Sequence, residues 1–218
     1  MILFLFNVLL IDQVVNQKMP KTKEQFEQIR LERQKIILNA ALYLFATRGY
    51  DATSSDAISA TANCSHGLIY HYYPTKADLV KAVFEDVVHP IAHQIFKDVD
   101  FNQKAKFVLT DLTDAFLLAL KNSNDEYVWS LHLLLNLHVN SMISPIIKDI
   151  DKNKKVHSKL IEIVEQGKAE GDFREASTKE QVATLLALYK GLVHVRLTVG
   201  YKKFICPHSD IIMSMLLK

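Results

Sequence analysis

The fold is decided by Thr53-Ser-Ser-Asp-Ala-Ile-Ser-Ala-Thr-Ala-Asn-Cys-Ser-His-Gly-Leu-Ile-Tyr-His-Tyr-Tyr-Pro-Thr-Lys-Ala-Asp-Leu79, which holds three helix starts and two tight turns. Segments 53–56 and 75–78 are typical of capping boxes, in which a hydroxyl caps a free backbone N–H and an acidic side chain reaches back. Ser65 is a third N-cap, and Asn63 suits a left-handed turn. The stretch therefore predicts helices over 54–62 and 66–72 and a third helix from Lys76.

The helix predicted over 66–72 is too short to supply an apolar face for a core of its own. Its expected role is to be presented at the surface, and the major groove of duplex DNA is wide enough to admit a helix. The pattern therefore predicts a helix-turn-helix.

Residues 52–79 resemble the DNA-binding segment of TetR-type bacterial transcriptional regulators. The preceding Ile36-Ile-Leu-Asn-Ala-Ala-Leu-Tyr-Leu-Phe-Ala-Thr-Arg-Gly-Tyr50 resembles the first helix of that family, and the resemblance extends over residues 33–85. The positions that fall in register are Gly49, Thr53, Ile58, Ser65, Gly67, Tyr70, Tyr73, Lys76 and Leu79. The chain departs from the family at Asn63, where Gly is common, and at His66, where Lys is common. We therefore expect a phosphate contact at His66 to be weak or pH-dependent.

The resemblance implies a set of DNA-binding residues, which are Thr53, Ser54, Ser65, His66, Gly67, Tyr70, His71, Tyr72 and Lys76. Thr53 is expected to act first as an N-cap, with a hydroxyl that can also reach phosphate. We expect the side chains of 70–72 to face DNA and those of Ile69 and Tyr73 to fill the core; the alternative is that one of the three aromatic residues fills the core instead. Lys76 lies in the first turn of its helix, where positive charge opposes the helix dipole, which favours a phosphate-facing role.

Composition agrees with this prediction without deciding it. The chain has 218 residues and a formal net charge of +2, and residues 18–48 carry seven Lys or Arg against three Glu, a local excess of 7 − 3 = +4. Such an excess is a modest basic footprint for DNA binding. Two cysteines do not make a disulfide framework, so a reducing, cytoplasmic setting is expected.

Residues 1–18 form an atypical extension whose first eleven residues are nearly all apolar. That run is too short for a transmembrane helix and lacks the basic start and cleavage site of a signal peptide. Met19-Pro-Lys-Thr-Lys resembles an ordinary start, so we expect residues 1–18 to be dispensable or a mis-assigned start. The alternatives are an arm that packs on a partner or on the second domain, and a membrane anchor.

The remainder has helical patterning, and we expect an all-α protein with a helix-turn-helix domain over 19–75 and a ligand-binding and dimerisation domain over 76–218. Helices are expected over 101–120, 126–140, 154–170, 178–199 and 207–217, with Pro90 kinking or breaking the helix that starts at Lys76. A capping box over 178–181 is expected to open the helix that starts at Thr178. The helices over 154–170 and 178–199 resemble the dimerisation pair of the family. Small and apolar residues there suit close helix packing in a two-fold dimer: Leu160, Val164, Ala183, Leu186, Ala187, Lys190, Gly191 and His194. The alternative is packing within one subunit.

A ligand cavity between the helices of the second domain would be lined by Phe116, Trp129, His132, Met142, Tyr189 and Arg196. The alternative for each aromatic is an ordinary core position. Arg196 lies in an apolar helix, so it must be paired, exposed or facing an anionic ligand.

No metal-ligand spacing, cofactor fingerprint or hydrolase motif occurs in the sequence, so we expect neither a metal site nor a cofactor nor an enzyme. Two functions remain. The first is a homodimeric repressor that binds a palindromic operator in double-stranded DNA and is released by a small-molecule effector, with no membrane partner. The second is a helical ligand-binding adaptor of the same fold that has lost operator binding.

Overall fold

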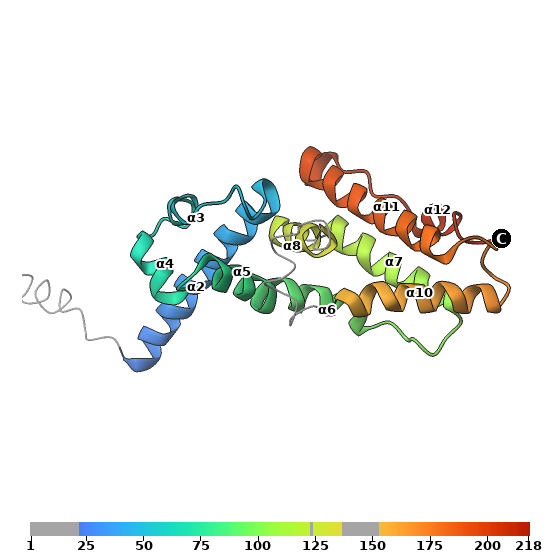
Figure 1. The fold of residues 1–218 in the computed structure, drawn as a ribbon, viewed down its shortest axis with the longest axis horizontal. Helices are drawn as coiled ribbons and strands as arrows, with labels where there is room; N and C mark the ends of the chain where they lie inside the picture. Colours follow the sequence, from blue (N-terminus) through green and yellow to red (C-terminus); the bar gives the residue numbers. More distant parts are fainter. Residues whose placement is uncertain (1–21, 123, 137–152) are drawn as a thin grey trace, which may run out of the picture. The chain divides into compact units, whose positions relative to one another are not determined.

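The computed structural model describes residues 22–122, 124–136 and 153–218, and these residues are predominantly helical (Figure 1). The elements are α2 (Lys23–Arg48), α3 (Ser55–Thr61), α4 (His66–Tyr72), α5 (Lys76–Val83), the π-helical turn η1 (Phe84–Val88), α6 (His89–Lys97), α7 (Ala105–Asn122), α8 (Asp125–Asn136), α10 (Asn153–Ala169), α11 (Thr178–Val199), the 3-10 turn η3 (Tyr201–Lys203) and α12 (Ser209–Met213). The all-α fold class is therefore confirmed, while residues 1–18 lie outside the described residues.

Contacts divide the chain into two units, Met1–Lys35 and Ile36–Lys218. The described part of the first unit is the amino-terminal half of α2, whose side chains are mostly exposed. Arg30 and Glu27 form an ion pair at 2.6 Å there, and Phe26 and Leu31 are 60% and 50% exposed. An exposed ion pair of this kind contributes no more than about 1 kcal/mol.

The second unit contains a first hydrophobic core, built by α2 from Ile37 onward, α3, α4, α5 and η1. Two left-handed residues shape it: Gly49 ends α2 with φ 84°, and Asn63 makes the α3–α4 turn with φ 48°. The N-cap at Ser65 and the capping box between Thr75 and Asp78 are confirmed by their hydrogen bonds. The predicted short helix over 66–72 is also confirmed. This core extends past residue 76 through Val88 and also includes Leu133, and the expected domain boundary at 75/76 stays a prediction.

Two of the predicted N-caps are wrong by one residue. Ser54, not Thr53, caps α3 by accepting a hydrogen bond from the Ala57 N–H. Ser177, not Thr178, caps α11 by accepting from the Glu180 N–H. Thr53 and Thr178 are buried, because their hydroxyls are used inside the protein.

The helix that starts at Lys76 continues across Pro90 and does not break there. It passes from α5 into the π-helical turn η1 and then into α6, with the His89 N–H bonded to the Phe84 carbonyl five residues back. Pro90 has no N–H to offer the Asp86 carbonyl. The wider turn before it is the local rearrangement that keeps the chain helical.

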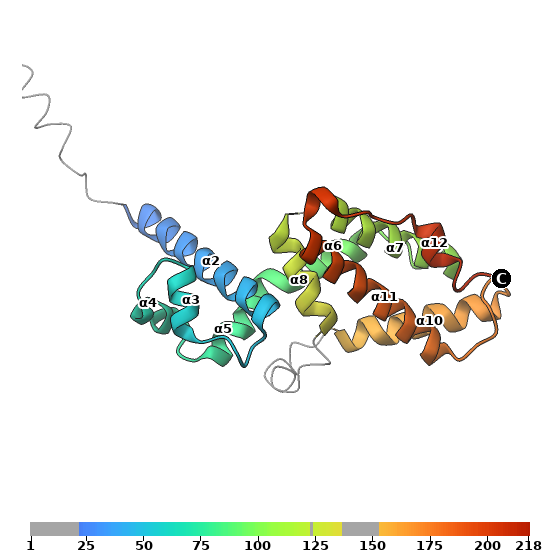
Figure 2. The ribbon, with the colours of Figure 1, turned by 90° about the horizontal axis from the view of Figure 1, so that it is seen from above.

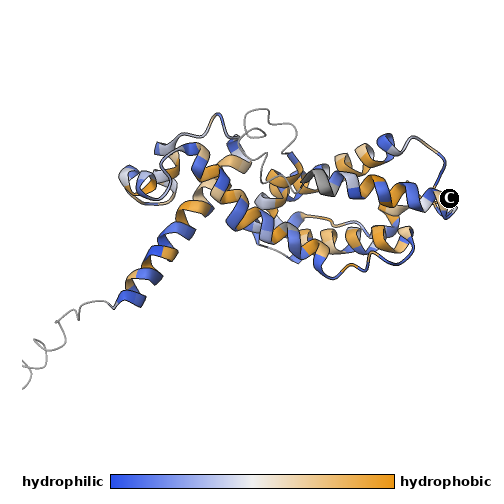
Figure 3. Cartoon of the chain, turned by 60° about the horizontal axis from the view of Figure 1, so that its bottom comes forward, coloured by the Kyte–Doolittle hydropathy of each residue, from blue (hydrophilic) through white to orange (hydrophobic). Residues whose placement is uncertain are grey.

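A second hydrophobic core is formed by α7, α8, α10, α11 and α12. In Figure 2, α10 and α11 lie side by side, joined by a turn at Gly171 with φ 80°. Hydrophobic and hydrophilic residues are interleaved along these helices (Figure 3). Helix α11 is also long and apolar enough to cross a membrane by length and composition. That test is passed equally by helices that pack in a soluble protein, so it decides nothing here.

Helix α8 belongs to both cores. Val128 and Leu131 pack in the second core, whereas Leu133 is buried in the first. On the same side as Leu133, the Trp129 ring lies 4.8 Å from that of Tyr43 in α2. One short helix therefore joins the packing of the two clusters.

The α10–α11 turn depends on a close approach at Gly167. A Cβ at this position would lie 2.2–2.7 Å from ring atoms of Phe173, which is fully buried. We expect Gly167→Ala to lower the free energy of unfolding by about 1–3 kcal/mol, because the ring has no free space to move into. Urea unfolding followed by circular dichroism measures this change.

The matched control is Gly67→Ala in α4, where a Cβ would meet nothing within 4 Å. Its unfolding free energy should be unchanged or raised by up to about 1 kcal/mol, because alanine favours helix over glycine. Equal effects of the two substitutions would contradict this account of the turn.

Candidate DNA-binding interface

Helices α3 and α4 form the helix-turn-helix, and each begins at a serine N-cap. Ser65 accepts a hydrogen bond from the Leu68 N–H, which starts α4 directly after the left-handed Asn63. The predicted core residues Ile69 and Tyr73 are buried at 2% and 8% exposure. Burial, with Asp86 and Tyr72 nearby, raises the pKa of Tyr73 to about 12. These contacts hold one face of α4 against the first core and leave the opposite face open.

Most of the predicted DNA-binding residues lie on that open face. The exposed ones are Ser54, Ser65, His66, Gly67, Tyr70 and His71. Tyr72 is half-buried, packs against the first core, and has its ring 6.3 Å from that of Tyr73. Tyr72 therefore lies at the edge of the open face, and its contact with DNA stays a prediction.

Thr53 does not lie on the open face. It is 1% exposed, and its hydroxyl donates to the carbonyls of Gly49 at 2.7 Å and Leu44 at 3.2 Å. The expected contact between this hydroxyl and phosphate is therefore corrected. Thr53 closes the turn between α2 and α3 and thereby positions Ser54.

Lys76 is half-buried at the start of α5. Its ammonium lies 4.1 Å from the centre of the Tyr50 ring, a cation–π distance. Burial lowers the pKa of Lys76, and the carboxylate of Asp51 opposes that shift. No observation tests whether Lys76 faces phosphate, so this stays a prediction. The Tyr50 ring holds the Lys76 ammonium in place.

A polar cluster links α3 to α4 across the turn. His66 Nε2 lies 3.3 Å from Asp56 Oδ1, and the His66 and Tyr70 rings meet edge to face at 4.7 Å. The Tyr70 hydroxyl donates to Ser55 Oγ at 3.4 Å. Sequence reasoning treated Asp56 only as a capping residue and did not single out Ser55. The sequence shows only that Asp56 and His66 are ten residues apart. That spacing predicts a contact only once it is known how the turn places α3 against α4.

Comparison with known proteins agrees with this geometry. Residues 37–83 match the family model described as bacterial regulatory proteins of the tetR family. Residues 37–83 therefore form a DNA-binding domain of the TetR type. The HTH-type transcriptional regulator LuxR of Vibrio harveyi is 28% identical over 87 residues, which are 40% of this chain and 42% of LuxR. The chain thus matches less than half of the length of its curated relatives.

Solved structures of other regulators resemble more of the chain. The MbdR regulator from Azoarcus sp. CIB has a TM-score of 0.66 and 22% identity, with 85% of this chain and 97% of MbdR covered. AibR, solved in complex with isovaleryl coenzyme A and operator DNA, has a TM-score of 0.62 and 20% identity, with 85% of this chain and 98% of AibR covered. At these identities the likeness shows a shared fold.

Most of the predicted ligand-pocket residues make contacts within the fold. The Phe116 and Tyr189 rings are 4.5 Å apart, and the Tyr189 hydroxyl is 2.7 Å from that of Thr113. Burial raises the pKa of Tyr189 to about 12; the hydrogen bond with Thr113 opposes this rise and Asp114 adds to it. Burial, with His194 nearby, lowers the pKa of His132. Met142 lies outside the described residues.

Arg196 is paired, which was one of the three possibilities for it. Its side chain is 2% exposed, and it donates to the Leu120 carbonyl at 3.3 Å and to Asp125 Oδ1 at 3.2 Å. It therefore ties the end of α7 and the start of α8 to α11. Such a buried guanidinium satisfies the last carbonyls of one helix while its charge is balanced by an acidic residue.

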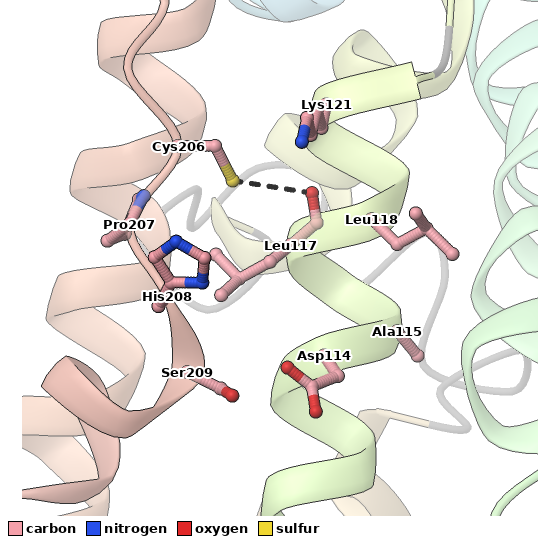
Figure 4. Close-up of a pocket in the computed structure, with 9 residues that line it drawn as sticks. All are labelled: Asp114, Ala115, Leu117, Leu118, Lys121, Cys206, Pro207, His208 and Ser209. Carbon is pink, nitrogen blue, oxygen red and sulfur yellow. Dashed lines mark hydrogen bonds between the residues drawn. The ribbon is translucent and has the colours of Figure 1, made fainter.

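A groove of about 350 Å³ lies between α7 and the segment that leads into α12 (Figure 4). Asp114 and Lys121 lie along one wall, and His208 lies on the other. The Cys206 thiol points to the Leu117 carbonyl at 3.6 Å, and burial raises the pKa of this thiol, with Lys121 opposing the rise. The groove has a different lining from the cavity expected from sequence.

The predicted dimer residues divide into two groups. Leu160 and Val164 are buried in the second core of the same chain, so the expectation that they face a partner is wrong. Ala183, Ala187, Gly191 and His194 are exposed along α11, with Leu186 and Lys190 half-buried beside them. A stripe of small residues therefore remains open on α11.

We expect Thr53→Val to lower the free energy of unfolding by about 1–2 kcal/mol, because two carbonyls lose a buried donor while the shape of the side chain is kept. Thermal unfolding measures the loss. Affinity for DNA, measured well below the unfolding transition, should stay close to that of the parent protein.

The comparison variant is Ser54→Ala, which removes the N-cap of α3 and should cost about 1 kcal/mol. If the Thr53→Val protein is as stable as the parent but binds DNA less tightly, the Thr53 hydroxyl contacts phosphate after all.

Proposed function

We propose that this TetR-family protein is a DNA-binding transcriptional regulator that represses transcription until a small-molecule effector releases it from its operator. The observation that carries the proposal is the open face of α4, on which exposed His66, Tyr70 and His71 are held by a buried Ile69 and a capping Ser65. A short helix held in this way can enter the major groove with several side chains at base edges.

The proposal includes a homodimer and a palindromic operator in double-stranded DNA. The open small-residue stripe on α11 supports it, because small residues let two helices approach closely. A two-fold dimer would hold two copies of α4 about 34–36 Å apart, which is one turn of DNA. As a regulator of DNA it would act in the cytoplasm.

Effector release requires a connection between the second domain and the helix-turn-helix. Two contacts between α2 and α8 support one: Asn39 Nδ2 donates to Glu126 Oε2 at 3.1 Å, and the Tyr43 ring packs at a tilt against the Trp129 ring. A ligand that prefers one arrangement of α8 must, by reciprocity, change the affinity for DNA. AibR, which has the same fold, was solved with both an acyl coenzyme A and operator DNA.

A second function is a ligand-binding adaptor of the same fold that no longer binds an operator. One observation favours it: residues 54–72 contain no Lys or Arg, so the recognition segment has little positive charge for phosphates. The two functions differ in the salt dependence of DNA binding. A regulator should bind a fragment from upstream of its own gene with an affinity that falls steeply with salt, whereas the adaptor should show no specific binding at any salt concentration.

His71 and Lys76 should affect DNA binding in different ways. We expect His71→Ala to relax sequence preference, because a good base contact is worth about 1–3 kcal/mol of discrimination. Lys76→Ala should weaken binding about equally on all sequences and reduce the slope of log K against log salt by about one. Fluorescence anisotropy on operator and scrambled duplexes measures both effects.

Lys81→Ala is the matched control for Lys76, since it removes a lysine of the same helix that lies 4.0 Å from Glu85. Its affinity and salt slope should follow those of the parent. If the His71 and Lys76 variants both bind like the parent, the recognition surface is wrongly assigned.

Trp129 should report on operator binding, because it is the only tryptophan of the chain and its ring contacts that of Tyr43 in the DNA-binding domain. We expect saturating operator to change Trp129 emission, and an effector that releases DNA to reverse that change. Raising the operator concentration should shift an effector titration to weaker apparent affinity.

A Tyr43→Leu protein provides the control, since it keeps an apolar side chain but removes the ring against Trp129. Its response to operator should be smaller than that of the parent. Emission that stays constant while anisotropy reports saturation would show that the α2–α8 contact does not respond to DNA.

A further inference from the structure

The recognition segment has an unusual balance of charge. Between residues 54 and 72 the sequence contains one carboxylate, Asp56, no Lys or Arg, and two histidines, His66 and His71. The Asp56 side chain is 86% exposed in the first turn of α3, and His66 Nε2 lies 3.3 Å from its Oδ1 atom. The charge of this segment therefore depends on whether its histidines carry a proton.

We propose that operator binding takes up a proton at His66, so that this histidine makes DNA affinity depend on pH. The proposal rests on the proposed DNA-binding function and adds a regulation to it. With His66 neutral, the Asp56 carboxylate is unbalanced on a surface that must approach a polyanion. With His66 protonated, the pair is neutral, and both ring nitrogens carry an N–H, so one can face Asp56 while the other faces phosphate.

The surroundings of His66 favour this role. From α3, the Asp56 carboxylate lies 3.3 Å from His66 Nε2, and Ser55 is held by the Tyr70 hydroxyl at 3.4 Å. From α4, the Tyr70 ring meets His66 edge to face at 4.7 Å and fixes the direction of the imidazole. The start of α4 opposes positive charge, because His66 is its first residue. DNA phosphates tip this balance towards the protonated form.

His71 provides the internal comparison. It lies in the last turn of the same helix, with its ring 5.2 Å from that of Tyr72. Among the described residues, no carboxylate forms an ion pair with it. A protonated His71 therefore has no acidic side chain to neutralise, and its loss should leave the proton linkage in place.

The direction of the effect follows from linkage. A group that binds its proton more tightly in the complex than in the free protein favours binding at low pH, and that gain is lost as pH rises. Histidine changes charge between about pH 5 and 8. Uptake of one proton therefore predicts up to about a tenfold loss of affinity per pH unit within that window.

The test measures operator affinity of the full chain from pH 5.5 to 8.0 at constant ionic strength. The parent should weaken as pH rises. His66→Gln should bind weakly with a flat profile, and His66→Lys should bind tightly with a flat profile. Asp56→Asn should bind more tightly than the parent at pH 8, and His71→Gln should keep the parent's pH slope. Calorimetry in two buffers of different ionisation enthalpy should show an uptake approaching one proton for the parent and none for His66→Gln.

The outcomes separate the two proposals. Specific binding with the same pH slope in His66→Gln as in the parent overturns the proton linkage and leaves the regulator intact. If neither the parent nor His66→Lys binds specifically even at pH 5.5, the regulatory function fails and the linkage fails with it. All four substitutions are at exposed side chains, and circular dichroism checks that each variant is folded.

Discussion

Helix α8 is shared by two hydrophobic cores, and the rest of the second unit depends on that sharing. Leu133 is buried with residues of α2 to η1, while Val128 and Leu131 are buried with α7 and α11. Apolar burial favours both sets of contacts at once, so α8 cannot move without loosening one of them. The Arg196 contacts to Leu120 and Asp125 hold its first turn in place. The proposed effector release depends on this constraint.

The recognition surface itself contains little charge. Its exposed face has rings, hydroxyls and one carboxylate, and the next lysine along the chain, Lys76, is held over the Tyr50 ring. Phosphate attraction normally supplies most of the affinity for DNA. To bind DNA, a segment without Lys or Arg needs positive charge from the basic stretch 18–48 or from its histidines. The contact of His66 with Asp56 therefore has a large share in the charge that this surface presents to DNA.

Much of the fold could be predicted because its signals are local. Helix starts at Ser65 and Thr75 and the left-handed turn at Asn63 depend only on backbone groups within a few residues, and all three are confirmed. The error at Thr53 arose because either of two neighbouring hydroxyls could cap the helix. Thr53 and Ser54 can both cap a helix, but the Leu44 carbonyl, nine residues away, takes the Thr53 hydroxyl. Leu160 and Val164 were assigned to a partner, because apolar patterning does not say which surface covers a helix face.

The sequence by itself determined the all-α class, the helix-turn-helix and the residues of the recognition helix, because capping, turn preference and helical periodicity act over short distances. The tertiary structure alone decided which side chains meet: His66 with Asp56, Tyr43 with Trp129, and Arg196 with the ends of α7 and α8. The members of these pairs are ten residues apart for His66 and Asp56, and more than seventy apart for the others. Their contacts follow from how complete helices pack into two cores, a long-range outcome that no local pattern encodes.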